Sequence, residues 1–295
     1  MSIGLARWRS SPILWALFGI FALAGLHSVT AVVEGNAVIL SAVLVVLALN
    51  SMRSGQDELA GALFAFAIMK PAAVLVLVLF VLFWSLAQRR WRLLAWFFGS
   101  IFLLSAAAMF FVFDWPLQYL RLLLAMVRQF GADSPAALFS TWWPGMGEKL
   151  GQMLSAVVFA VLVLEWWLAR SARDFGWFLW TASLSLTAGQ WIGLPASPEN
   201  FVLLLLPLAV IFAGLEERWK LGGRIAILIG LLVISAVPWL VYWRAGGTLL
   251  FAAVPPAGLL FLTPLVGLIG LYWVRWWTIR PKRTLLDEMR LRGEI

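Results

Sequence analysis

Long apolar runs that contain almost no charge are the feature that most restricts how this chain can fold. Ten such segments follow one another along 295 residues, and only 12% of the residues are charged. A soluble domain typically has about a quarter of its residues charged. Inside a bilayer the backbone must satisfy its own hydrogen bonds, so these runs predict helices. A transmembrane barrel would instead show alternating segments of roughly ten residues.

With about 20 apolar residues per crossing, the sequence predicts an all-α, polytopic transmembrane bundle of about eight full spans plus a short two-helix hairpin. Leu59–Met69 and Pro71–Ala87 form the hairpin, because the first of them can cover only about half of a 30 Å hydrocarbon core. The remaining segments are Ile13–Val33, Ala37–Met52, Leu93–Phe113, Leu150–Leu168, Phe175–Leu194, Phe201–Leu215, Ile225–Tyr242 and Ala257–Trp277.

The N-terminal segment has two interpretations. Arg7 and Arg9 precede Ile13–Val33, as basic residues precede the apolar core of a signal peptide. The apolar core is long and no small-residue cleavage motif follows it. We therefore expect an uncleaved membrane anchor.

Lysine and arginine positions predict the orientation. If the N-terminus is cytoplasmic, 17 Lys and Arg fall in cytoplasmic segments and 5 in outer ones. Short cytoplasmic loops carry an excess of positive charge, so we expect a multi-pass protein of the cell membrane with both termini cytoplasmic. Residues 1–279 then form one transmembrane domain, 114–148 form an outer loop, and 280–295 form a charged cytoplasmic tail.

Several functional classes lack the residues they require. The chain has no cysteine and one histidine, His27, which excludes thiolate and multi-histidine metal sites. No phosphate-binding loop, dinucleotide fingerprint, HExxH or GxSxG motif is present. The net charge of +8 arises from basic loops and gives no support for nucleic-acid binding.

Lys70 is the first candidate for a binding residue. A lysine within an apolar stretch is costly, which favours a functional role. Pro71 suits the first position of a helix, so the N–H groups of Ala72, Ala73 and Val74 would face the same apex. A lysine beside a helix N-terminus is a suitable phosphate site. The alternative is a lysine that extends to the outer interface.

Two short polar segments on the outer side are further candidates for contacting a polar substrate. In the first, Gly35 permits a tight turn, Asn36 can cap the next helix, and Glu34 could act as a base or sugar ligand. In the second, Glu199 and Asn200 could face the same outer cavity. The alternative for the first is a simple capped turn. For the second it is a helix start, since Ser197 and Pro198 precede the acid.

The outer loop offers lipid contacts. Trp115–Phe130 places Arg121 and Arg128 on one stripe of an amphipathic helix, which predicts an interfacial helix whose arginines contact lipid headgroups. Trp142 and Trp143 could stack on a sugar ring. An aromatic belt at the membrane interface explains them equally simply.

One ordered set of motifs resembles glycosyltransferase family 87, a family of GT-C-type membrane enzymes. The resemblance extends from about Glu34 to Trp219, and the Lys-Pro apex with its flanks is its most specific part. Glu199-Asn200, followed by Phe201–Pro207, is also similar to the family. The other motifs are Glu34-Gly35-Asn36-Ala37, Arg53-Ser54-Gly55-Gln56, Leu59-Ala60-Gly61-Ala62-Leu63, Met69-Lys70-Pro71 and Gln88-Arg89-Arg90-Trp91-Arg92.

The resemblance implies transfer of a sugar, usually mannose, from a polyprenyl-phosphate carrier to an acceptor on the extracytoplasmic side. It implies a GT-C-like fold, with the donor phosphate at Lys70 and with Glu34, Asn36, Glu199 and Asn200 near the substrate. The expected partners are this donor and membrane lipids. Because the donor is already activated, no cofactor is expected.

One element of the family has no counterpart here. GT-C enzymes generally carry a catalytic aspartate in a large first outer loop, whereas the first outer loop of this chain is only Val33–Asn36. We therefore expect a fragment, one half of a split enzyme with a separate N-terminal half, or an inactive paralogue, and assign no catalytic residue. The alternative function is a non-catalytic membrane subunit or a lipid-carrier transporter. A transporter usually shows paired broken helices, and only one hairpin is found.

Overall fold

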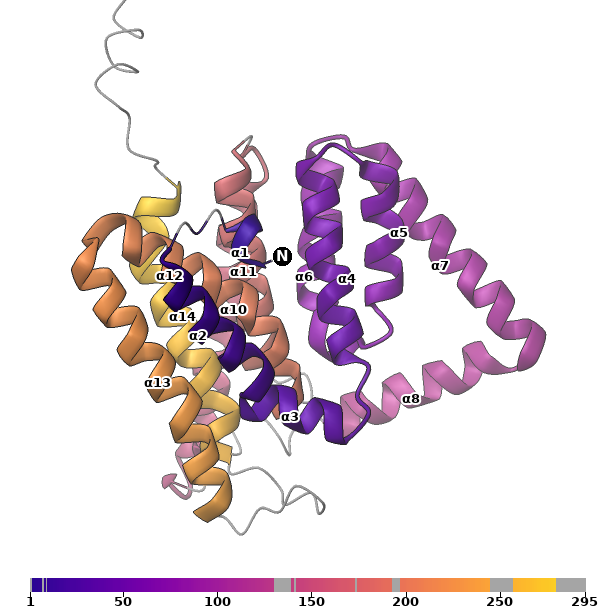
Figure 1. Cartoon of the computed structure of the whole chain (residues 1–295). Helices are drawn as coiled ribbons and strands as arrows, with labels where there is room; N and C mark the ends of the chain where they lie inside the picture. Colours follow the sequence, from indigo (N-terminus) through magenta and orange to yellow (C-terminus); the bar gives the residue numbers. More distant parts are fainter. Residues whose placement is uncertain are drawn as a thin grey trace, which may run out of the picture.

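The computed structural model describes residues 2–6, 8, 10–129, 139–140, 142–172, 174–192, 197–244 and 257–279. This part of the chain is helical throughout and contains no strand (Figure 1). The predicted all-α class is therefore correct. The helices are α1 (Ser2–Leu5), α2 (Pro12–Ala24), α3 (Leu26–Val33), α4 (Val38–Arg53), α5 (Asp57–Ala67), α6 (Pro71–Ala87), α7 (Trp91–Phe111), α8 (Trp115–Gln129), α10 (Gly147–Ala169), α11 (Phe175–Trp191), the 3-10 helix η1 (Pro198–Leu204), α12 (Leu205–Trp219), α13 (Leu221–Arg244) and α14 (Ala257–Ile279).

Exposed apolar surface identifies the chain as a membrane protein. Five helical stretches in the described part are long and apolar enough to cross a bilayer: Pro12–Val33, Trp91–Phe111, Gly147–Ala169, Glu199–Trp219 and Leu221–Arg244. In α7 only 11% of the apolar stretch is buried, and in α10 and α13 only 17%. Phe102 and Phe110, both on α7, are 76% and 94% exposed. Such surfaces require a lipid solvent.

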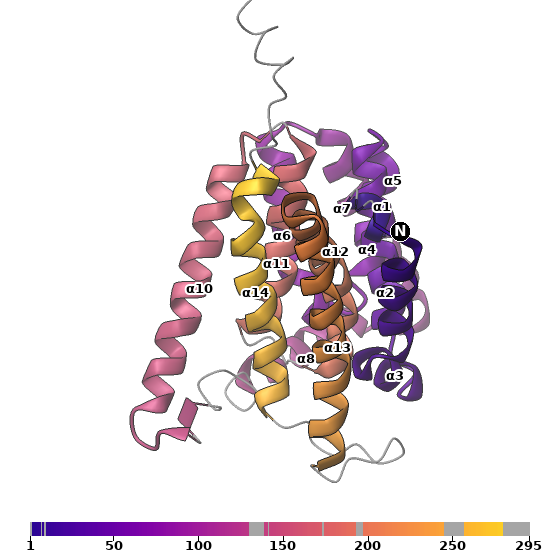
Figure 2. The ribbon, with the colours of Figure 1, turned by 60° about the vertical axis from the view of Figure 1, so that its left-hand side comes forward.

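The buried helix α11 is the centre of the bundle. It packs against α6, α10, α12 and α14 (Figure 2), and every residue from Phe178 to Trp191 is buried. Apart from Gln190, its polar side chains are mostly serine and threonine, and several bond back to the carbonyl four residues earlier, as Ser185 Oγ does to Thr181 at 2.8 Å. Small residues let helices approach closely in a membrane, where the hydrophobic effect between helices is weak.

A buried ion pair joins α10 to α14. Arg275 donates from Nε and Nη2 to the two carboxylate oxygens of Glu165, at 3.0 and 3.1 Å, and Tyr272 donates to the same carboxylate at 3.3 Å. The Arg275 guanidinium also lies over the ring of Trp180. Both oxygens of this buried acid are therefore satisfied, and the pair fixes α14 and α10 on either side of α11.

Replacing Glu165 by alanine should destabilise the protein by about 1–3 kcal/mol, because the partly buried Arg275, whose side chain is 24% exposed, would lose its ion-pair partner. Glu148→Ala is the matched control, since Glu148 lies in the first turn of the same helix and is exposed. It should change stability by less than about 0.5 kcal/mol. Unfolding in detergent micelles measures both, and equal losses would show that the ion pair has no special role.

The first apolar segment, expected as one continuous span over Ile13–Val33, is divided at Gly25. The backbone there is extended (φ −61°, ψ 145°), so α3 turns away from the axis of α2 (Figure 1). The break is satisfied internally, as membrane burial requires. Ser28 Oγ donates to the carbonyl of Ala22, and Trp239 Nε1 donates to the carbonyl of Ala24 at 3.0 Å.

Gly25→Ala should disrupt this bend. A Cβ at residue 25 would lie 2.6 Å from the Phe21 carbonyl oxygen and would clash with the His27 ring, whereas a Cβ at Gly19 on the same helix would meet nothing within 4 Å. We expect Gly25→Ala to lower stability by about 1–3 kcal/mol and Gly19→Ala to be neutral or slightly stabilising. Thermal unfolding in detergent compares them, and a harmless Gly25→Ala would contradict the close approach.

The segment Phe201–Leu215, expected as one apolar helix, is also divided. It begins as η1 and becomes α-helical at Leu205. Pro207 explains the change, because a proline lacks the N–H that an α-helix interior requires and is tolerated in its first turn. The α-helix therefore starts just before Pro207, and the preceding residues adopt the tighter 3-10 geometry.

The two ends of the bundle differ in charge. The upper end in Figure 1 carries the ends of α4, α6, α10, α12 and α14 and the starts of α5, α7, α11 and α13. The basic turn after α6 lies there: Arg90 pairs with Asp57 at 3.0 Å and covers the Trp84 ring, and Gln88 donates to the carbonyl of Arg170 at 2.8 Å. The opposite end carries the α3–α4 turn, the α5–α6 turn, the start of η1 and α8.

Helix α8 agrees with the interfacial helix expected at Trp115–Phe130, except that it ends at Gln129 and Phe130 lies outside the described residues. It lies at the lower end of the bundle and runs crosswise to α4, α5 and α6 (Figure 1). Arg121 is exposed on it. The side chain of Arg128 lies outside the described part, as do most of loop 130–141 and the tail 280–295.

Candidate functional site

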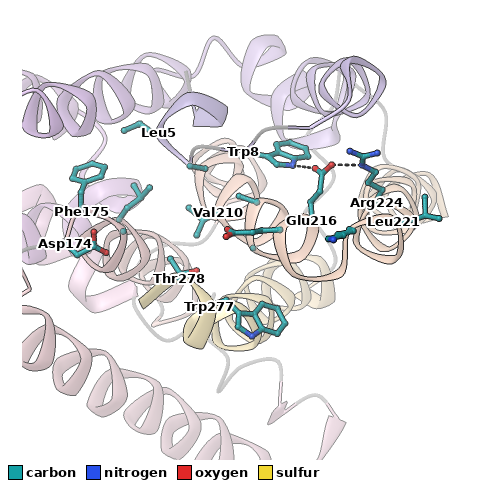
Figure 3. A pocket seen from close by; sticks show the side chains of 17 residues that line it. Leu5, Trp8, Asp174, Phe175, Val210, Glu216, Leu221, Arg224, Trp277 and Thr278 are labelled. Carbon is teal, nitrogen blue, oxygen red and sulfur yellow. Dashed lines mark hydrogen bonds and ion pairs between the residues drawn. The ribbon is translucent and has the colours of Figure 1, made fainter. Parts of the chain in front are cut away.

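The buried acids of this protein are of two kinds: those whose two carboxylate oxygens are both hydrogen-bonded, and those with an unpaired oxygen. Besides Glu165, the acid Glu216 is buried near the upper end, in the wall of a cavity of about 850 Å³. Trp8 Nε1 donates to one of its oxygens at 2.7 Å and Arg224 Nε to the other at 2.6 Å (Figure 3). These contacts join the N-terminal segment to α12 and α13. A buried acid with both oxygens satisfied needs no ligand.

Glu199 is a buried acid of a different kind. Its side chain is 7% exposed, and its Oε2 has no hydrogen-bond partner in the described part of the chain. The neighbouring Asn200 is 0% exposed, and both its Oδ1 and its Nδ2 lack partners there. Buried polar atoms are almost always paired. Three unpaired atoms on adjacent residues therefore mark the start of η1 as the candidate site.

Glu34 meets Glu199 across two separate segments of the chain. The bend at Gly25 carries α3 against η1, so the residue that ends α3 lies beside the residue that begins η1. A hydrogen bond to Glu199, partial burial and repulsion from the Glu199 charge together raise the pKa of Glu34 from its ordinary value of 4.5 to about 7. A neighbouring carboxylate disfavours the charged form of a carboxyl group, so Glu34 ionises less readily beside Glu199.

Asn36 holds the turn that presents Glu34. Its Oδ1 accepts a hydrogen bond from the Val38 N–H at the start of α4, at 3.1 Å, although the N-cap residue of α4 is Ala37 and not Asn36. Its side chain also hydrogen-bonds Glu34 and lowers the pKa of that carboxyl, against the stronger upward effects. Gly35 adopts φ +60°, a conformation that glycine adopts without strain.

Lys70 lies at the same end of the bundle. It is the residue before α6, and Pro71 occupies the first helical position as expected. Its charge lowers the Glu34 pKa, so the two groups interact electrostatically. Among the described residues the side chain of Lys70 makes no hydrogen bond or ion pair. A half-buried ammonium group is therefore available beside a helix N-terminus.

The first turn of α6 differs from the expected arrangement in one detail. Of the N–H groups of Ala72, Ala73 and Val74, that of Ala73 bonds the Lys70 carbonyl at 3.0 Å and is not free for an anion. Gln190, buried on α11, donates to the Ala73 carbonyl at 3.1 Å. This contact between α11 and α6 fixes the helix start that carries Lys70.

The structure thus brings together Glu34, Asn36, Lys70 and Glu199, with Asn200 adjacent in sequence. Arg121, expected to contact lipid headgroups, lies apart from them on α8. Trp142 and Trp143 are about half exposed, as interfacial tryptophans are. Sequence reasoning missed the pairing of the two acids and the role of Gln190. A glutamine in an otherwise apolar and small-residue helix was the available signal for Gln190.

Comparison of the chain with protein-family models, with curated proteins and with solved structures gave no match. The fold and site define a helical membrane protein with a hydrogen-bonded pair of carboxyl side chains and a lysine at one end of its bundle. What this site does is therefore inferred from its own chemistry.

The carboxyl pair predicts a pH dependence of stability. Because the folded-state pKa of Glu34 lies above its ordinary value, its contribution is fully present below about pH 4.5 and is lost as the pH rises through about 7. Melting temperature in detergent should therefore fall across this interval. Glu34→Gln should flatten that part of the profile, and Glu199→Gln should move the Glu34 titration to lower pH. A wild-type profile unaltered by either change would contradict the pairing.

Proposed function

We propose that this protein is a membrane glycosyltransferase of the GT-C type, similar to glycosyltransferase family 87. In this proposal it transfers a sugar, mannose by resemblance, from a polyprenyl-phosphate carrier to an acceptor on the extracytoplasmic side. The single observation that carries the proposal is the meeting of Lys70 with the Glu34–Glu199 pair at one end of the bundle. The site combines an anion-binding group with a base.

The position and charge of Lys70 support binding of a phosphate. The group lies at the end of an apolar helix, beside a helix N-terminus, and has no ion-pair partner in the described part. A cation in this position attracts a phosphate that is itself attached to a lipid. A lipid-linked donor reaches the site from the bilayer, which agrees with the absence of a nucleotide motif.

The carboxyl pair supports the chemistry of transfer. The acceptor hydroxyl oxygen attacks the anomeric carbon of the sugar, and the bond from that carbon to the phosphate oxygen breaks. Glu34 takes the hydroxyl proton, and the polyprenyl phosphate leaves with the electron pair, its charge stabilised by Lys70. A base with a pKa near 7 suits this role at neutral pH. The assignment of Glu34 as the base rests on its contact with Glu199 and not on the family resemblance, whose catalytic aspartate has no counterpart in this sequence.

The proposal includes a topology. About eight full spans plus the short α5–α6 hairpin cross or enter the cell membrane. The basic end of the bundle faces the cytoplasm, as the positive-inside rule requires, and the end with Lys70 faces outward. Both termini are then cytoplasmic.

Lys70→Ala should abolish sugar transfer and weaken binding of a polyprenyl phosphate by about tenfold or more, since a buried charge pair is worth at least about 1.4 kcal/mol. Lys149→Ala is the matched control, because Lys149 is an exposed lysine near the same end of the bundle. Glu34→Gln should abolish transfer and leave phosphate binding intact.

Nanodiscs that contain the purified protein permit binding and transfer to be measured separately. Unchanged binding in Lys70→Ala would refute the phosphate assignment. Binding that depends on Lys70 without any transfer would instead favour a non-catalytic lipid-carrier protein.

A further inference from the structure

A narrow apolar groove lies between the N-terminal helices and α4. Its volume is about 380 Å³. The walls come from α2 and α3 on one side and α4 on the other, and α11, η1 and α12 form the floor. Apart from Ser2 and Ser28, every lining side chain is a hydrocarbon.

Small side chains produce the hollow, and large ones are exposed at its rim. Ala22 and Ala42 face it from opposite walls. Leu23, Val32 and Val43 line it and are 79%, 67% and 44% exposed. The groove is therefore open along its length to whatever surrounds the bundle, which in a membrane is hydrocarbon.

One end of the groove adjoins the candidate site. Val32 lies two residues before Glu34 at the end of α3, and Ile39 lies three residues after Asn36 at the start of α4. Val202 of the floor lies three residues after Glu199. From Ile39 to Val46 the groove runs along α4 for about 10 Å away from that end.

We propose that this groove holds the first isoprene units of the lipid phosphate whose head group occupies the Lys70–Glu34–Glu199 site. The inference rests on the proposed function for the identity of the head group. Its basis is that three residues lining the groove lie two or three positions along the chain from Glu34, Asn36 and Glu199, at a polar site that contains unpaired buried atoms. A phosphate anchored at Lys70 must direct its chain into the membrane, and the groove is the apolar path that starts beside the carboxyl pair.

A second apolar groove provides a control. It lies between α10 and α14, has a volume of about 660 Å³, and is lined by Val161, Leu162, Leu268 and Tyr272 among others. None of its lining residues belongs to α3, α4 or η1, so it does not adjoin the carboxyl pair. Val161 is 37% exposed, close to the 44% of Val43. The same Val→Trp substitution can therefore fill either groove with little effect on folding.

The test uses an isoprenyl phosphate that carries a photoreactive group on its second isoprene unit, presented in phosphatidylcholine nanodiscs. In the wild-type protein the cross-link should map to peptides that contain residues 39–46 or 22–32. Unlabelled polyprenyl phosphate should compete with it, and phosphatidylglycerol should not. Val43→Trp should reduce labelling by about tenfold, and Val161→Trp should leave it unchanged.

Each outcome bears on one of the two proposals. Cross-links to the α10–α14 groove, or full labelling in Val43→Trp, would overturn the groove assignment alone. Labelling of residues 39–46 that persists in Lys70→Ala would support the groove and overturn the phosphate assignment. If phosphatidylglycerol competes for labelling as well as unlabelled polyprenyl phosphate does, the groove binds ordinary bilayer lipid. That result would overturn its assignment as a donor site.

If Val43→Trp proves unstable, Ala42→Phe fills the same groove from its α4 wall. Its thermal unfolding in detergent identifies a folded sample before labelling. A folded Ala42→Phe protein with full labelling would again contradict the proposal.

Discussion

Hydrogen-bond satisfaction in a low-dielectric solvent is the constraint on which the rest of this structure depends. Where the chain breaks a helix, other groups satisfy the freed carbonyls, as Ser28 and Trp239 do around Gly25. Where it buries an acid, an arginine and a hydroxyl or indole bind it, as at Glu165 and Glu216. Other buried polar atoms in the described part also lack a partner, but Glu199 and Asn200 place three such atoms on adjacent residues.

The bend at Gly25 links architecture to the site. A continuous first span would carry Glu34 away from η1. The extended backbone at one glycine instead lays α3 against η1 and brings two carboxyls into contact. The same bend opens the groove between α2–α3 and α4. One local break therefore creates both the polar end and the apolar channel of the proposed lipid-phosphate site.

Local properties of the chain were predictable from the sequence by itself. Apolar runs and helix caps predicted the all-helical membrane fold, most helix boundaries and the Pro71 start of α6. These features are local because a helix satisfies its backbone within itself. The candidate residues Glu34, Asn36, Lys70, Glu199 and Asn200 were also identifiable, since polar groups stand out in apolar sequence.

Only the tertiary structure determined which of those residues contact one another and how these contacts change their chemistry. The division of Ile13–Val33, the pairing of Glu34 with Glu199 and the support of α6 by Gln190 each join segments that are distant in sequence. The pKa of Glu34 near 7 arises from a neighbour 165 positions away. Hydropathy cannot encode such contacts, because the bilayer stabilises each helix separately and only packing between helices determines which ends meet.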